Sequence, residues 1–216
     1  MNRRTYLAAG AAVAASLAGC LGDRGGRGGE PALDISGDEL VAEGGEVYLA
    51  VTVENTGAGP SGWITLDVDW YAADGEFLAN DLGHLWTLGP DEQWDARVYF
   101  SGASADLVEE YGVEGMADPE VRTVIDGLEP REVEMQAVED RVVVTGRIAN
   151  EIGEDQPSVD VISILYDDRG VVLGDAWAAV SDLAAEENRP FETSWPGRDR
   201  AGSAVDQRTF VSESAF

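Results

Sequence analysis

The 216-residue chain contains no lysine, one cysteine and one histidine. A single cysteine excludes an intramolecular disulfide from the fold, and one histidine excludes a blue-copper centre, which needs a cysteine and two histidines. All 14 basic residues are arginines, against 42 aspartates and glutamates, and the formal net charge is −28. This acidity argues against nucleic acid or anionic lipid as a partner, because neither offers positive charge to neutralise.

Catalytic motifs are also lacking. The only histidine, His84, lies near a predicted strand end, where a surface role is commoner than a catalytic one. A Ser-His-Asp triad is still an alternative, but the sequence has no G-x-S-x-G nucleophile turn. It also lacks the residue spacing of an EF-hand calcium loop. The pairs Asp67/Asp69 and Asp167/Asp168 suit Ca²⁺ binding or glycoside hydrolysis, yet arise by composition alone in so acidic a chain. We expect no catalytic residues, no metal and no cofactor; a hydrolase that uses carboxylates and His84 is the alternative.

Residues 1–19 have the pattern of an export signal. Arg3 and Arg4 precede an uncharged stretch rich in Ala and Leu, as in a signal peptide. The stretch is shorter than the roughly 20 residues of a membrane-spanning helix, so a permanent transmembrane anchor is the weaker interpretation. Arg3-Arg4-Thr5-Tyr6-Leu7 resembles the R-R-x-[FY]-L core of twin-arginine signals, which a receptor reads on proteins exported already folded.

A lipid anchor is predicted directly after this signal. Leu17-Ala18-Gly19-Cys20 resembles a lipobox, in which small residues expose the bond before a cysteine that then carries lipid. Cys20 is thus the predicted lipidation site and membrane lipid its partner, with a buried thiol as the alternative. Residues 20–30 include five glycines, and such coil spans on the order of 17 Å over ten residues. We expect a tether on the extracellular face of the cytoplasmic membrane.

The acidic balance predicts a halophilic protein. Loss of residues 1–19 removes two arginines and no acid, which leaves 12 positive and 42 negative charges and a net charge of −30. Such a chain repels itself in dilute buffer, whereas at molar salt the Debye length falls to about 3 Å and screens the repulsion. Because 44% of residues are hydrophobic, the chain can still bury a core. This composition is typical of salt-loving archaea.

An internal repeat with an offset of 95 residues aligns 47–102 with 142–197 without a gap. Identical pairs include Val47/Val142, Asn55/Asn150, Tyr71/Tyr166, Gly75/Gly170, Leu78/Leu173, Leu88/Leu183, Glu92/Glu187 and Gly102/Gly197. Within each copy apolar and polar residues alternate, which indicates strands, and Asp74-Gly75 suits a hairpin turn. We predict an all-β fold of two tandem immunoglobulin-like antiparallel β-sandwich domains.

The region between the copies differs in pattern. Ser104 is expected to cap a short helix to about Tyr111, and Asp118-Pro119-Glu120 to begin a second helix that ends at Gly127. Part of the polar tail is expected to be loosely held. The predicted order is a signal peptide 1–19, a tether 20–30, a sandwich 31–102, a short helical connector 103–129, a sandwich 130–197 and a tail 198–216.

The repeated motifs resemble the FxLyD domain. Each copy has an apolar strand ending in Asn, an aromatic or Leu-Tyr pair, a glycine turn, and a Leu-to-Glu motif before an aromatic strand. These are Val53-Glu54-Asn55, Trp70-Tyr71, Asp74-Gly75, Leu88 to Glu92 and Phe100, then Ile148-Ala149-Asn150, Leu165-Tyr166, Arg169-Gly170, Leu183 to Glu187 and Trp195. The second copy replaces the Gly-Pro turn with Ala184-Ala185. The resemblance implies an immunoglobulin-like extracellular module with no known catalytic residues.

Tryptophans are the candidate ligand contacts. Trp70 and Trp195 occupy predicted core positions, whereas Trp63, Trp86 and Trp177 could form an exposed sugar-stacking surface, with core or interface use as the commoner role. The leading hypothesis is a non-catalytic, membrane-anchored extracellular binding or scaffold lipoprotein with a surface protein or glycan as partner. The alternative is an accessory solute- or glycan-binding lipoprotein with an aromatic cleft between its domains.

One strand differs between the copies on its second face. Thr65, Asp67, Asp69 and Tyr71 in the first copy correspond to Asp160, Ile162, Ile164 and Tyr166 in the second. Two exposed isoleucines would forfeit about 1.5–3 kcal/mol each. We therefore expect Ile162 and Ile164 to be buried against a connector helix or the tail's Phe210, and Asp67 and Asp69 to be exposed.

Overall fold

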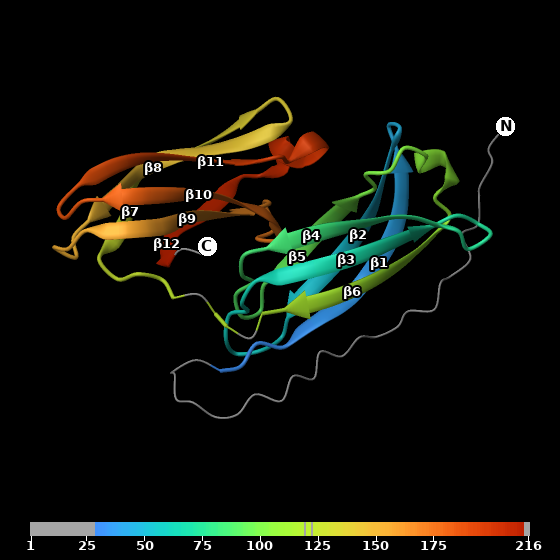
Figure 1. Ribbon diagram of the computed structural model, residues 1–216, viewed down its shortest axis with the longest axis horizontal. Coiled ribbons are helices and arrows are strands. Elements are labelled where there is room, and N and C mark those ends of the chain that lie inside the picture. Colours follow the sequence, from blue (N-terminus) through green and yellow to red (C-terminus); the bar gives the residue numbers. More distant parts are fainter. Residues whose placement is uncertain (1–28, 119, 122, 214–216) are drawn as a thin grey trace.

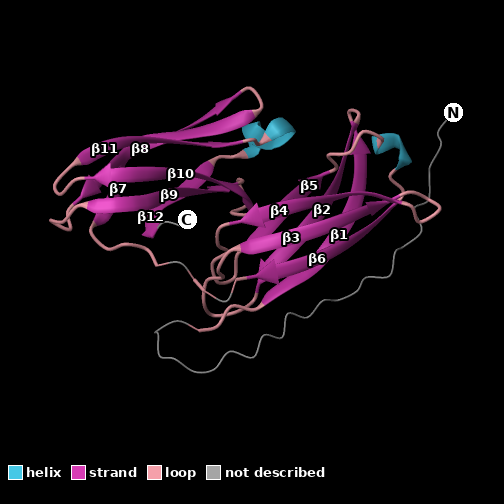
Figure 2. Ribbon diagram, in the orientation of Figure 1, coloured by secondary structure: helices cyan, strands magenta, loops and turns pink. Residues whose placement is uncertain are grey.

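The structure is a computed structural model that describes residues 29–118, 120–121 and 123–213. The predicted signal peptide with Arg3 and Arg4, the lipidation site Cys20 and most of the tether lie outside the described residues. The described chain is all-β, as predicted, with twelve strands and two short 3-10 helices (Figures 1 and 2). Within it, no helix is long and apolar enough to cross a membrane.

The N-terminal half packs two layers of three antiparallel strands face to face, with the orders β1-β2-β5 and β4-β3-β6. Side chains alternate across each layer, so the apolar face of β2 and β3 is buried while the other face is partly exposed. The elements are β1 (Leu33–Glu43), β2 (Glu46–Asn55), β3 (Ile64–Tyr71), β4 (Phe77–Leu85), β5 (Gln93–Tyr99), η1 (Ala105–Leu107) and β6 (Glu110–Ala117).

The C-terminal half repeats this architecture, with the orders β7-β8-β11 and β10-β9-β12. Strands β7 and β8 begin and end 95 residues after β1 and β2, so the repeat in the sequence is a repeat of structure. The elements are β7 (Leu128–Val138), β8 (Arg141–Asn150), β9 (Gln156–Tyr166), β10 (Val172–Leu183), β11 (Asn188–Trp195), η2 (Arg198–Ser203) and β12 (Asp206–Glu213).

The two halves share one sheet. Its six strands have the order β1-β2-β5-β10-β9-β12, and a short parallel contact between Trp94 of β5 and Val172 of β10 joins the halves. Figure 1 shows the halves side by side, with the end of β4 directed toward the C-terminal half. We call this contact region the joint.

The repeated asparagines fix the same turn in each half. Asn55 is buried, and its Nδ2 donates to the carbonyl oxygens of Gly59 and Leu88, both at 2.9 Å. Asn150 does the same with the carbonyl oxygens of Glu154 and Ala184, at 2.9 and 3.0 Å. Because a buried amide needs partners for its donors, each asparagine ties the end of one strand to the loop before β5 or β11. The repeat therefore preserves a structural bond.

The predicted helical connector 103–129 is wrong in its described residues, where the only helical segment is the 3-10 turn Ala105–Leu107. Residues Glu110–Ala117 form β6, which pairs with β3 along its whole length. The described part of the tail is not loose, because Asp206–Glu213 forms β12 and pairs with β9; residues 214–216 lie outside the described residues. In both cases an inner strand would otherwise leave a row of backbone groups unpaired, and pairing satisfies them. The N-terminal half thus reaches Ala117 and the C-terminal half takes in the tail.

Ile162 and Ile164 are fully buried, as predicted, with the tail's Phe210 beside them as expected, but the N-terminal half covers them in place of a connector helix. They belong to the apolar core of the N-terminal half, with the tail's Phe210 packed beside them. Asp67 and Asp69 are half-buried, not exposed, because Asn80 on the neighbouring β4 donates its Nδ2 to both carboxylates.

Candidate functional site

The joint collects an aromatic row of His84, Trp63, Trp86 and Trp177. Trp63 precedes β3 and Trp86 follows β4, and the antiparallel pairing of Ile64 with Leu85 brings their rings to 5.4 Å. His84 lies on the other side of Trp63, with ring centroids 5.5 Å apart. Trp177, from β10 of the other half, completes the row with its ring centroid 6.2 Å from Trp86.

Members of the row differ in exposure. Trp177 is 43% exposed and Trp86 only 2%, while Trp63 is half-buried and His84 is exposed. The structure therefore brings the three candidate tryptophans together, and the buried Trp86 has the core use that was the commoner expectation. It fills the N-terminal core and supports the other rings from beneath. A ligand can reach Trp177 and the edge of Trp63.

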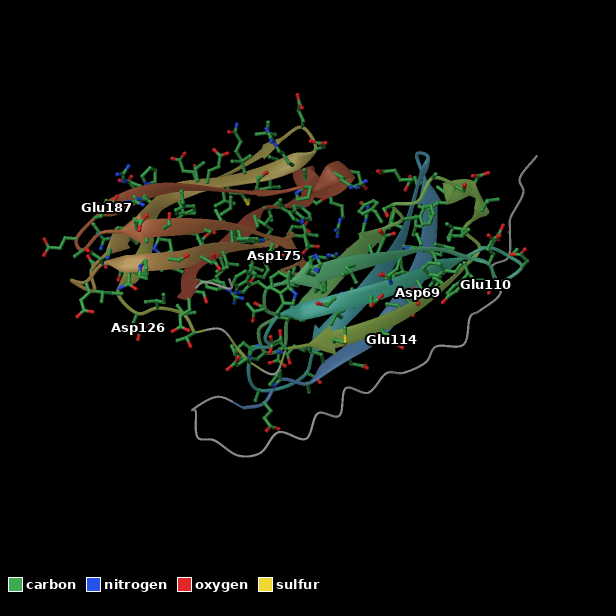
Figure 3. The ribbon with its side chains drawn as sticks, in the orientation of Figure 1. Asp69, Glu110, Glu114, Asp126, Asp175 and Glu187 are labelled. Carbon is green, nitrogen blue, oxygen red and sulfur yellow. The ribbon has the colours of Figure 1, made fainter. Side chains whose placement is uncertain are left out.

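Asp175 is a joint residue that the sequence analysis missed. It lies two positions before Trp177 on β10, so both side chains are on the same face of the sheet. Its Oδ2 accepts a 3.2 Å hydrogen bond from the backbone N–H of Trp86 in the other half. Burial of the carboxyl group raises the pKa of Asp175 to about 7. Figure 3 shows Asp175 where the two halves meet.

Glu92 connects the halves through its carboxylate. Its Oε1 accepts a 3.0 Å hydrogen bond from the Tyr166 hydroxyl and lies 3.1 Å from the Arg208 guanidinium. Burial is the main cause that raises the pKa of Tyr166. The repeat alignment marked both Glu92 and Tyr166, yet the spacing gave no sign that one residue contacts the other.

Arginines from η2 add a second group of contacts across the joint. Arg200, almost buried, donates to the carbonyl oxygen of Asp95 at 2.6 Å. Arg97 of β5 pairs with Asp199 at 2.8 Å, and Arg198 pairs with Glu46. Hydrogen bonds, ion pairs and a shared apolar core together hold the halves in one arrangement.

His84 is the histidine of the alternative hydrolase hypothesis, which requires an acid beside it in a pocket. Its ring lies against Trp63, and partial burial there lowers the pKa of His84. Among the described residues, no group of three or more His, Cys, Asp or Glu side chains could hold a metal ion.

One open depression lies away from the joint, on the β7-β8-β11 layer. Glu132, Glu134, Glu192, Arg147 and Phe191 contribute to its lining. Its floor is shaped by Gly146, since a Cβ there would lie 2.8 Å from the Phe191 ring. The depression presents carboxylates to solvent, as much of this acidic surface does.

Comparison with known protein families found no family model that matches the chain, and no curated protein matches its sequence.

Proposed function

We propose that this protein is a non-catalytic, membrane-anchored extracellular binding or scaffold lipoprotein, with the aromatic row as its contact surface. The observation that carries the proposal is Trp177, which is 43% exposed at the joint while its ring lies beside the buried Trp86. A large aromatic side chain on rigid support, rimmed by polar groups, is typical of the residues that dominate binding energy at interfaces.

The amino-terminal motifs support the proposed location. Arg3 and Arg4 in the twin-arginine pattern and Cys20 in the lipobox would place the folded part on the extracellular face of the cytoplasmic membrane. The glycine-rich tether ends shortly before β1 begins at Leu33. The resemblance to FxLyD domains supports the same location, and the face-to-face β layers suit an immunoglobulin-like extracellular module.

Binding to intact cells tests the proposal. Folded protein with Cys20→Ser, labelled at its amino terminus, would be titrated onto washed cells of the source organism in molar NaCl. Trp177→Ala should weaken saturable binding at least tenfold. Leu82→Ala is the matched control, because Leu82 occupies the equivalent position in the N-terminal half and is 52% exposed. Equal binding by both variants would contradict the contact surface, and no saturable binding by the parent protein would contradict the binding function.

A glycan is the second candidate ligand, favoured by the exposed ring of Trp177. A sugar ring could stack on Trp177, because the apolar face of a sugar suits an aromatic surface. Calorimetric titration with a panel of neutral oligosaccharides separates the candidates. Binding heat that disappears in Trp177→Ala favours a glycan, whereas cell binding that free oligosaccharides leave unchanged favours a surface protein.

A further inference from the structure

The joint is a contact between two different surfaces, and each half carries a copy of both. We call the β10-β9-β12 side of the C-terminal half, with Ile162, Ile164 and Phe210, the joint face. We call the side of the N-terminal half with Trp86 and Trp94 the joint end. An interface between two unlike surfaces leaves one surface of each kind unused. If molecules made the same contact with one another, they would form an open-ended row.

Among the described residues, no further strand pairs with the outer edge of either unused copy of these surfaces. The β4-β3-β6 layer of the N-terminal half is the second copy of the joint face, and β4 is an edge strand there. The far side of the C-terminal half, beside edge strand β11, is the second copy of the joint end. The fold thus offers each molecule a surface for the next molecule at both ends.

The free copy of the joint face has lost its apolar residues. Ile162 pairs with Phe210 across β9 and β12, and the corresponding pair across β3 and β6 is Asp67 with Glu114. Two positions along, Ile164 is replaced by Asp69. Figure 3 shows Asp69 and Glu114 on the N-terminal half, away from the joint. Three carboxylates therefore stand where the joint has two fully buried isoleucines and the partly buried Phe210.

The free copy of the joint end has changed as well. Trp86 and Trp94 correspond to Ser181 and Arg189 in the 95-residue repeat. The free copy of the joint face also lacks the arginines of η2, because η1 carries Ala105, Asp106 and Leu107, whereas η2 supplies Arg198 and Arg200. Neither free surface keeps the apolar residues of the joint, although Tyr71 and Glu187, the counterparts of Tyr166 and Glu92, are still present.

We infer that these residue exchanges prevent an open-ended assembly of molecules. The interface between two sandwich halves then forms once within a molecule and not between molecules. Docking on the free face would bury three carboxylates, and the cost of their desolvation opposes it even though Asn80 donates to Asp67 and Asp69. Loss of two tryptophans removes the apolar contact that the free end would need. The inference rests on the two copies of each surface and not on the proposed binding function.

Mixing two repaired variants tests the inference. A face variant would carry Asp67→Ile, Asp69→Ile and Glu114→Phe, and an end variant would carry Ser181→Trp and Arg189→Trp. Light scattering after gel filtration in molar NaCl should show a monomer for the wild type and for each variant alone. A one-to-one mixture of the variants should form a complex at least tenfold tighter than either variant forms with wild type. Association of the wild type through these surfaces, or no complex in the mixture, would overturn the inference.

A reverse substitution gives an independent test that does not depend on the repaired surfaces. Phe210→Glu places a glutamate in the joint, as at the corresponding position Glu114 of the free face. Small-angle scattering should then show a larger radius of gyration than for wild type, as the joint opens while both halves keep their strand content. Glu213→Gln on the same strand, in an exposed position, is the control. A joint that stays closed in Phe210→Glu would contradict the assigned role of this exchange.

Discussion

The hydroxyl of Tyr166 donates a 3.0 Å hydrogen bond to Oε1 of Glu92, across 74 residues of sequence and from one half of the molecule to the other. The equivalent Tyr71 donates within its own strand instead, to Asp69 at 3.4 Å. Glu92 keeps the turn-forming role that both repeats share, because its Oε2 accepts from the Gly89 N–H at 2.6 Å. Glu92 thus holds its own turn and also joins the two halves through Tyr166.

Removal of the Tyr166 hydroxyl should destabilise the molecule. Tyr166→Phe leaves the half-buried ring in place and removes a hydrogen bond to a carboxylate, a loss of about 1–2 kcal/mol in the free energy of unfolding. Tyr71→Phe is the matched control and should change it by less than about 0.5 kcal/mol. Urea unfolding in molar NaCl measures both. Equal losses for the two variants would show that the bond across the joint contributes nothing of its own.

Asp175 should make stability depend on pH. Burial raises the pKa of Asp175 to about 7, against about 3.9 in the unfolded chain. Between these values the folded state binds more protons than the unfolded state, so this group's contribution makes stability fall as pH rises from about 4 to 7. Asp175→Asn, which places the amide found at the equivalent Asn80, should melt several degrees above wild type at pH 8, with a smaller difference at pH 5 and none near pH 4.

The control for this pH effect is Asp182→Asn, an exposed aspartate on the same strand. Its melting temperature should follow that of wild type across the whole range. Differential scanning calorimetry at fixed molar NaCl keeps the screening of the other carboxylates constant. If Asp175→Asn and wild type differ by the same amount at pH 5 and pH 8, the carboxyl group does not titrate with the raised pKa.

Salt should stabilise the fold strongly. The formal net charge of −28 repels the compact state in dilute buffer, and molar NaCl screens that repulsion. The ion pairs across the joint, such as Arg97 with Asp199, weaken in the same range, but the excess of negative charge outweighs them. The melting temperature should rise steeply from dilute buffer to molar NaCl, and sulfate should raise it further. A flat profile would refute the halophilic interpretation.

Export and anchoring should depend on Cys20 and the arginine pair. Cys20→Ser should prevent lipid modification and move the protein from the membrane fraction to the medium, or leave it unprocessed. Substitution of Arg3 and Arg4 by lysines should keep the precursor inside the cell, because the receptor reads the guanidinium pair. Immunoblots of fractionated cells measure both, and a Cys20→Ser protein that stays with the membrane would refute the lipid anchor.

The sequence predicted the strands because their alternation and turns are local signals. The 95-residue repeat placed β7 and β8 relative to β1 and β2, and Asp74-Gly75 correctly indicated the hairpin, with Gly75 at φ +82°. Strand β6 was mistaken for helix because Ser104 and Asp118-Pro119 are typical helix starts. Its pairing with β3 is a long-range contact that no local pattern shows.

The candidate site was only partly predictable for the same reason. Trp63, Trp86 and Trp177 could be proposed as ligand contacts because they are aromatic and lie outside the predicted core positions. The burial of Trp86, however, depends on how the two halves meet. Asp175 gave no sequence signal beyond an acid on an apolar face of β10. Ile162 and Ile164 did reveal that a partner surface must cover them, although the partner is the N-terminal half.

Photo-crosslinking in intact cells tests the proposed contact surface most directly. Trp177→p-benzoylphenylalanine would be introduced into the full chain with its signal and Cys20, and the cells irradiated. We predict a discrete adduct with a cell-surface component from this position. The same replacement at Leu82, the equivalent and similarly exposed residue of the N-terminal half, should give none. An absence of adducts at Trp177, or the same adducts at both positions, would contradict the account.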